Sequence, residues 1–279
     1  MNAYENSATR KKPNESYCQA FPEIAAAIFS FATSREAAPG IYAYFDIGGG
    51  TVDGVVFNLM RIDGEGKTVF FSGHVAALGV DWVAESVCER LANSFGENYQ
   101  PERVKTIMFM KRNDMIDLAF NDYTDKITKF ASGIISEAKQ KDRNKNWRET
   151  KVQNFPNVRT IRDIWNDSNI DPLTVFVGGG GNTSPIYIHA LDNAYLANNS
   201  LKNLGVPPLS LEEVPAPPDL MMRSADPSEY HRFLIAYGLS VPFGEGPDFK
   251  LPGQVKRAPR PPKRVPDVPD SLDHKDIFD

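Results

Sequence analysis

Residues Ala43–Leu59 read AYFDIGGGTVDGVVFNL, and this stretch decides the fold. Two apolar, β-branched segments flank three consecutive glycines, Gly48–Gly50, with Asp46 before them and Asp53 after them. The apolar segments predict two strands joined by a tight turn. Because glycine has no Cβ, backbone N–H groups in such a turn can approach a phosphate closely and form an anion-binding nest.

The residues around this turn are those that a phosphate and metal site needs. Asp46, at the end of the incoming strand, is predicted to hold Mg²⁺ through its waters. Thr51 follows the glycines and offers a hydroxyl to a phosphate or to an attacking water. A plain hairpin with a glycine bulge is the alternative, and Asp53 has a structural role in that interpretation. The turn is not a P-loop, because no Gly-Lys-Ser/Thr follows and the next element is a strand.

The flanking sequence predicts how the strands continue. Strands are expected over Ile41–Ile47, Thr51–Ile62 and Lys67–Ala76, which makes three consecutive antiparallel strands. Helices are expected over Pro22–Thr33, over Gly79–Gly96, over most of 101–140, near Thr160–Asn166 and over Pro227–Val241. The charged segment 140–151 is expected to be an exposed loop or a short hairpin.

A second glycine loop lies far along the chain, in FVGGGGNTSP (Phe176–Pro185). A buried strand is predicted before it, and a helix after it with Pro185 in its first turn and Ser184 or Thr183 as its cap. A right-handed crossover is expected to place Asp171–Val177 beside the three antiparallel strands, as a parallel strand of the same sheet. The loop is similar to a dinucleotide turn, but the second strand with its acidic residue is absent. The glycines therefore favour an adenosine lying flat on the backbone, with a simple helix-entry loop as the alternative.

Composition narrows the class of protein. The chain has 279 residues, 41% of them hydrophobic, and a net charge of −5, which argues against a nucleic-acid binder that depends on bulk positive charge. Cys18 and Cys88 are far apart and are interpreted as reduced packing residues; no Cys/His cluster has metal-ligand spacing. No apolar run is long enough to span a bilayer, and residues 1–20 lack an apolar signal core. We therefore expect a cytoplasmic protein without a nucleic-acid or membrane partner.

Taken together, the two loops resemble motifs of the actin, heat-shock chaperone and sugar-kinase ATPase superfamily, with the chaperone branch closer. DIGGGTVD is similar to its second phosphate motif, and VFVGGGGNTSP resembles its adenosine motif. PEIAAAIFSF and FLIAYGLS resemble the two connecting helices. HVAALGVDWVAE resembles the segment that opens a helix after the third strand, and SEAKQ the helix that packs on adenine and ribose. The likeness covers about Phe21 to Ser240, in the family's order.

This resemblance implies an α/β, ribonuclease-H-like lobe with a mainly helical inserted subdomain over about 97–170. The lobe is expected over 20–245, and the polar composition of 1–19 and the proline-rich, charge-segregated composition of 246–279 predict a flexible N-terminus and a disordered tail. The implied ligands are ATP or ADP with Mg²⁺. Asp46 and Thr51 take the catalytic roles, and Asp46 serves the metal. The implied phosphate and nucleoside contacts are Gly48, Gly49, Gly50, Thr51, Gly178, Gly179, Gly180, Gly181 and Lys139.

The resemblance covers only the second lobe of the family's two. Nothing in the chain resembles the first phosphate loop, and Phe21 stands where the family has a glutamate, with Glu23 two residues later. The chain is therefore predicted to be the nucleotide-binding half of a chaperone- or actin-like ATPase, hydrolysing ATP only if the missing lobe is supplied. It is expected to need a protein partner, or to self-associate, through the missing-lobe face. An inactive interaction or assembly module and a filament-forming actin relative are the alternatives, and truncation, a misplaced start and a split ATPase stay open.

Overall fold

The computed structural model describes residues 22–34, 37–62, 65–95, 99–110, 114–142, 172–196, 199–217, 220, 226–241 and 248–255. Its helices are α2 (Glu23–Ala27), α3 (Phe29–Thr33), α4 (Val80–Phe95), α5 (Pro101–Met108), α6 (Asp114–Lys141), α8 (Pro185–Leu196), α9 (Asn199–Asn203) and α10 (Leu234–Ser240), with 3₁₀ turns η2 (Pro227–Arg232) and η3 (Pro252–Gln254). Its strands are β1 (Gly40–Ile47), β2 (Val52–Ile62), β3 (Glu65–Ala76), β4 (Leu173–Gly178), β5 (Leu209–Glu212) and β6 (Asp248–Lys250).

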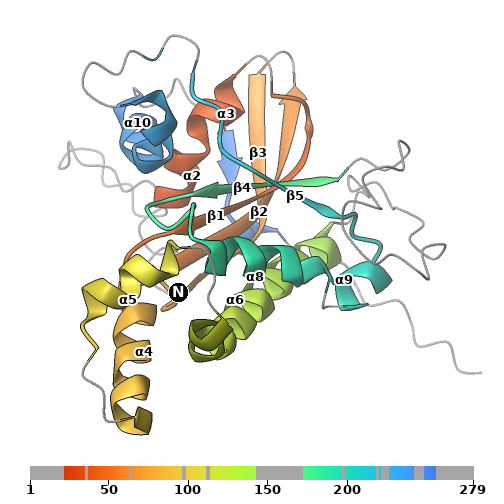
Figure 1. Cartoon of the computed structure of the whole chain (residues 1–279). Coiled ribbons are helices and arrows are strands. Elements are labelled where there is room, and N and C mark those ends of the chain that lie inside the picture. The colour runs from red at the N-terminus through yellow and green to blue at the C-terminus, as the bar shows by residue number, and fades with distance from the viewer. Residues whose placement is uncertain are drawn as a thin grey trace, which may run out of the picture.

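These strands form one mixed sheet in the order β5-β4-β1-β2-β3-β6 (Figure 1). The first three strands along the chain are antiparallel neighbours, as predicted. The strand before the second glycine loop, β4, lies parallel to β1, and β5 lies parallel to β4. This strand order confirms the predicted fold class, an α/β, ribonuclease-H-like lobe.

Alternation along the strands divides the core between the two faces of the sheet. Phe45 and Ile47 of β1 are buried in the cluster that contains side chains of α4, α6 and α8. Tyr44, the residue before Phe45, is buried on the other face with side chains of α2, α3 and α10. Successive side chains of a strand point to opposite faces, so both faces of β1 are covered. Asp46 continues the Tyr44 side of the strand.

The helices α2 and α10 cross closely on that second face. A Cβ added to Gly238 of α10 would overlap the backbone of Ala26 in α2, so only glycine permits this approach. Tyr230, just before α10, donates a hydrogen bond from its hydroxyl to Ser30 Oγ at 2.8 Å. The two segments predicted to be connecting helices therefore pack on each other although they lie about two hundred residues apart in the chain.

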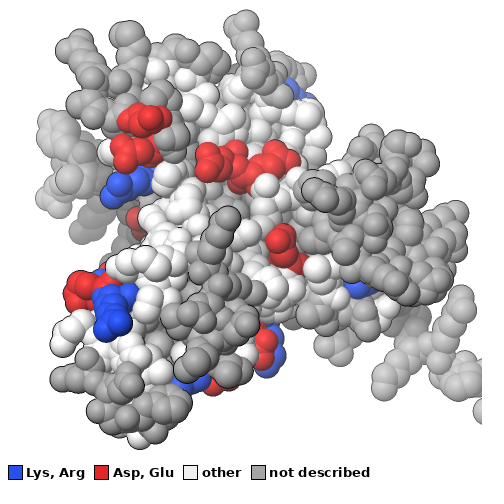
Figure 2. Space-filling view, in the orientation of Figure 1, with Lys and Arg blue, Asp and Glu red and all other residues white. Residues whose placement is uncertain are grey.

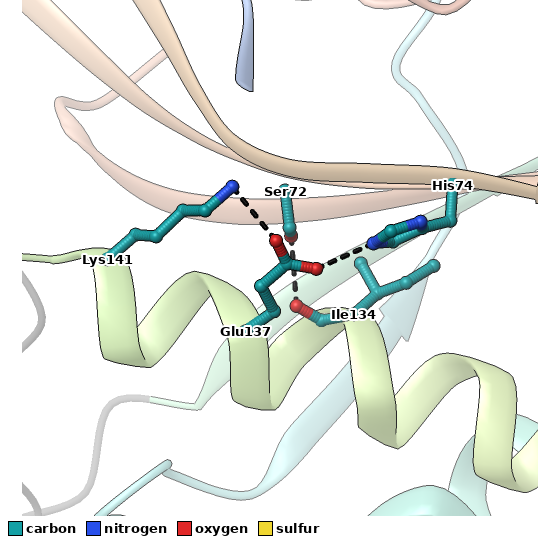
Figure 3. A network of polar contacts seen from close by, with 5 residues as sticks. All are labelled: Ser72, His74, Ile134, Glu137 and Lys141. Carbon is teal, nitrogen blue, oxygen red and sulfur yellow. Dashed lines mark hydrogen bonds and ion pairs between the residues drawn. The ribbon is translucent and has the colours of Figure 1, made fainter. Parts of the chain in front are cut away.

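A network of polar contacts fixes α6 on the opposite face (Figure 3). The Ser72 hydroxyl of β3 donates to the Ile134 carbonyl of α6 at 2.9 Å. His74 Nε2 lies 2.6 Å from Glu137 Oε2, and Lys141 Nζ lies 2.9 Å from the other oxygen of that carboxylate. The contacts join one strand to the last two turns of α6. The segment 101–141 is thus largely helical as predicted, and α6 belongs to the layer that covers the sheet.

Several boundaries differ from the prediction. The helix expected over Pro22–Thr33 is two short helices that meet at Ile28, and the one expected over Pro227–Val241 is a 3₁₀ turn followed by α10. Residues Asp248–Lys250, placed in the predicted tail, pair with β3 as β6, so the packed chain extends past residue 246.

The predictions for 1–19, for 143–151 and for Thr160–Asn166 concern residues outside the described part of the chain. Within the described residues, no helix has the length and apolar character to cross a bilayer.

Candidate nucleotide site

The glycine turn between β1 and β2 is held against the start of α4. The Gly48 N–H donates to the Thr51 carbonyl at 2.9 Å and closes the turn. The carbonyls of Gly48 and Gly49 accept hydrogen bonds from the backbone N–H groups of Val80 and Asp81 at 2.9 and 2.8 Å, and the Gly50 carbonyl accepts from Gly79 at 3.2 Å. Three carbonyls of the turn therefore satisfy N–H groups at the beginning of α4, where a helix lacks internal acceptors.

This arrangement decides where the N–H groups of the turn point. The N–H of Gly49 shares a peptide unit with the Gly48 carbonyl, and the same holds for Gly50 with Gly49 and for Thr51 with Gly50. In a trans peptide the C=O and N–H point in opposite directions, so these three N–H groups face away from α4. In the described part of the chain none of them donates to a backbone oxygen. Gly49, Gly50 and Thr51 are all exposed, so the turn presents three N–H groups to solvent.

The second glycine loop lies directly beside the first. The parallel pairing of β1 with β4 sets Asp46 opposite Gly178. Gly179 has φ +80°, and a Cβ there would overlap both Asp46 Oδ1 and the Ile47 carbonyl. The Gly181 N–H donates to the Ile47 carbonyl at 2.9 Å. The two motifs are 130 residues apart in sequence, and the strand register brings them into contact.

Like charges gather where the loops meet. Asp46 and Asp53 are direct partners in the β1–β2 register, and carboxylates placed directly opposite each other repel. Burial raises the pKa of Asp46 to about 6, with further contributions from the charges of Asp53 and Glu23. Burial also raises the pKa of Asp53, while a hydrogen bond from Thr51 acts in the opposite direction. Asp53 Oδ1 is buried and has no hydrogen-bond partner.

These carboxylates suit a cation that is shared with a ligand. No three His, Cys, Asp or Glu side chains in the described ranges are grouped so that they hold a metal by themselves. Mg²⁺ usually takes only one or two carboxylates and completes its shell with water and substrate phosphates. The buried oxygen of Asp53 and the mutual repulsion with Asp46 therefore fit Mg²⁺ arriving with a nucleotide.

The structure brings together all but one of the residues predicted for the site. Asp46, Gly48–Thr51 and Gly178–Gly181 lie at the same end of the sheet, where β1 and β4 end. Lys139 lies in the last turn of α6. Figure 1 shows the C-terminal end of α6 beside α9, which follows the C-terminal end of α8. The second glycine loop leads into the other end of α8, its N-terminus. Lys139 is therefore not brought to the second glycine loop.

Two residues near the site were not assigned to it from the sequence. Glu23 begins α2, and its charge contributes to the raised pKa of Asp46. It therefore lies near the site, although it comes two residues after Phe21, the position where the family has its glutamate. Tyr44 is fully buried, and a Cβ on Gly178 would overlap its hydroxyl. The period-two alternation of β1 places Tyr44 on the face of Asp46, and this is the only sequence signal that points to it.

Comparisons with known proteins find likeness only in solved structures. A scan against protein-family models finds no match, and neither does a search of curated proteins. Similar structures include an archaeal actin homolog (13% identity, TM-score 0.39, 79% of this chain and 54% of that one). Another is MreB5 of Spiroplasma citri bound to AMPPNP (12% identity, TM-score 0.43, 85% of this chain and 62% of that one). A third is the PilM–PilN type IV pilus biogenesis complex (14% identity, TM-score 0.41, 80% of this chain and 52% of that one).

The present chain spans between 52% and 62% of the length of these structures. At such identities and TM-scores, the likeness carries neither the function nor the partners of these proteins over to this chain. The closer relation to the chaperone branch and the absence of a first lobe stay predictions.

Proposed function

We propose that this chain is the nucleotide-binding lobe of an actin- or chaperone-like ATPase, and that it binds ATP or ADP with Mg²⁺ in the cytoplasm. The observation that carries the proposal is the contact between the two glycine loops, with Gly179 lying against the Asp46 carboxylate. One loop presents three outward N–H groups, which suit the β- and γ-phosphates. The other is an adjacent glycine surface, which suits the adenosine.

Asp46 would hold the metal ion through its waters, with the unpartnered oxygen of Asp53 beside it. Thr51 would contact a phosphate with its hydroxyl when that group leaves Asp53. The ribose contact predicted for Lys139 gains no support from its place at the end of α6. Phosphoryl transfer depends on positioning and on neutralising charge from several sides. Turnover is therefore proposed to require a second lobe, supplied by another chain or another copy.

The test is thermal unfolding with and without Mg·ADP, for the wild type and for Asp46→Asn. Ligand at about a hundred times its Kd stabilises a protein by about 2.7 kcal/mol. For a domain of this size we expect a rise in Tm of roughly 5–10 °C, and Asp46→Asn should abolish it. Asp125→Asn, on the exposed face of α6, is the matched control and should keep the full shift.

The ligand-free variant gives an independent check that the protein is folded. A carboxyl group whose pKa is raised in the folded state makes the folded protein less stable as the pH increases. The loss of stability begins near the ordinary pKa of the group and is complete above the raised pKa. For Asp46 that window runs from the ordinary aspartate pKa of 3.8 to the raised pKa of about 6. Asp46→Asn should therefore raise the Tm of the ligand-free protein at pH 7.

No shift in the Tm of the wild type at millimolar Mg·ADP would contradict nucleotide binding by this chain and would favour the inactive assembly module.

A further inference from the structure

The helix α5 contacts the end of the second glycine loop and the start of α4. Its Met108 carbonyl accepts a hydrogen bond from the Ser184 hydroxyl, at the end of the second loop, at 2.7 Å. Val104 and Met108, one turn apart, are buried in the core cluster. The Nζ of Lys105, next to Val104, lies 2.7 Å from Asp81 Oδ1 at the start of α4. The helix that carries Lys105 is thus joined to the end of the second loop and to the helix against which the first loop is held.

Asp81 lies against the glycine turn. A Cβ on Gly49 would overlap Asp81 Oδ2, so the space beside that backbone is filled by a carboxylate. This carboxylate is therefore beside Gly49, whose N–H is one of the three proposed to receive phosphate. An uncompensated negative charge there would repel a phosphate, because two charges of the same sign a few ångströms apart interact strongly near a protein surface.

Lys105 compensates that charge and has donors to spare. An ammonium group carries three N–H donors, and only one is needed for the contact with Asp81. About a third of the Lys105 side chain is accessible, at 33%. The hydrogen bond with Asp81 and the charges of Asp81, Glu102 and Glu85 raise the pKa of Lys105, although desolvation acts in the opposite direction. Figure 2 shows acidic and basic side chains next to each other over α5.

We propose that Lys105 is a phosphate-binding residue, whose ammonium lies beside Asp81 near the glycine turn and donates to the terminal phosphates of the bound nucleotide. This inference rests on the proposed function and adds to it a cation supplied by the lobe itself. Asp81 is paired with Lys105 in the structure, and it competes with the phosphate for the same ammonium group.

The test compares binding of Mg·ADP and of AMP, measured by NMR titration, for the wild type and four variants. Lys105→Gln should weaken Mg·ADP binding about tenfold or more, which is the range for a hydrogen bond to a charged group, and should affect AMP less. Lys105→Arg keeps the charge and should retain most of the affinity. Lys129→Gln removes the same charge from an exposed position of α6 and should bind like the wild type.

Asp81→Asn separates a phosphate contact from a merely structural ion pair. Both Lys105→Gln and Asp81→Asn break the pair. If Lys105 binds phosphate, Asp81→Asn should tighten Mg·ADP binding, because it removes a repelling charge and frees a donor. Asp81→Asn weakening Mg·ADP binding as Lys105→Gln does, or Lys105→Gln binding like the wild type, would overturn the role of Lys105 alone. A wild type that does not bind Mg·ADP would overturn the proposed function and this inference with it.

Discussion

At the scale of single residues, the glycines of the second loop differ in what surrounds them. Gly179 has positive φ and no room for a Cβ, because Asp46 and the Ile47 carbonyl occupy that space. Gly180, its neighbour, faces open space. The two positions are adjacent and chemically identical, so they form a matched pair for substitution.

We predict that Gly179→Ala is destabilising by about 2 kcal/mol or more, since it combines left-handed backbone strain with a steric overlap. Gly180→Ala should change the free energy of unfolding by no more than about 0.5 kcal/mol. Urea denaturation monitored by circular dichroism measures both. Equal effects of the two substitutions would show that the loop is not packed against Asp46 in the way described.

The sequence predicted most residues of the candidate site, because their chemistry is local. Asp46, Gly48–Gly50 and Thr51 are neighbours in one turn, and their residue types indicate phosphate and metal without any tertiary information. Lys105 was not found, because its place depends on the ion pair with Asp81 and on the packing of α5. Ser184 precedes α8 as predicted, but its hydroxyl bonds a carbonyl 76 residues earlier, which no local pattern encodes.

At the scale of elements, α6 is fixed to β3 by one carboxylate. Glu137 lies between His74 and Lys141, and although burial alone would raise its pKa, hydrogen bonds from these two side chains lower it to about 2. A lowered carboxyl pKa contributes stability that is complete above the ordinary value of 4.5 and is lost as pH falls from there toward 2. The stability that Glu137 contributes is thus lost as the pH falls, whereas for Asp46 stability is lost as the pH rises.

We predict that Glu137→Gln lowers the free energy of unfolding at pH 7 by about 1 kcal/mol, a modest figure because the group is partly exposed to solvent. The difference from wild type should shrink as the pH is lowered below 4.5. Glu89→Gln, on the exposed face of α4, is the control. A difference that stays constant down to pH 2.5 would mean that the ion pairs do not stabilise the contact between α6 and β3.

The elements that the sequence predicted well are those with strong patterns. The strands β1 to β3 begin and end within two residues of their expected bounds, and α8 begins at Pro185 as expected. The strands β5 and β6 were not predicted, because four and three residues are too few to show alternation. Each short strand forms because it pairs with the edge of a longer strand: β5 pairs with β4, and β6 pairs with β3.

At the scale of the whole molecule, the exposed apolar residues near α10 concern association. Phe233 and Leu239 are 45% and 56% exposed, and α10 packs on α2. These two helices resemble the family's connecting helices, so this side of the molecule is where a second lobe is expected. Burying such side chains at an interface is favourable by about 1.5 kcal/mol or more each.

We predict concentration-dependent self-association of the wild type, measured by sedimentation velocity. A double variant, Phe233→Ser with Leu239→Ser, should reduce it strongly. Ile62→Ser removes a similarly exposed apolar side chain at the end of β2 and should leave association as in the wild type. A wild type that sediments as a monomer at every concentration, or a double variant that associates equally well, would contradict this use of the surface.

The hydrogen bonds between the glycine turn and the start of α4 have an electrostatic consequence. The aligned peptide units of a helix give its N-terminus a partial positive charge. The N–H groups at the start of α4 donate to Gly48, Gly49 and Gly50, and hydrogen bonds in series polarise one another. The peptide units of the turn therefore extend the dipole of α4 through a segment that is not helical. Their outward N–H groups carry the positive end of a sixteen-residue helix to the surface of the site.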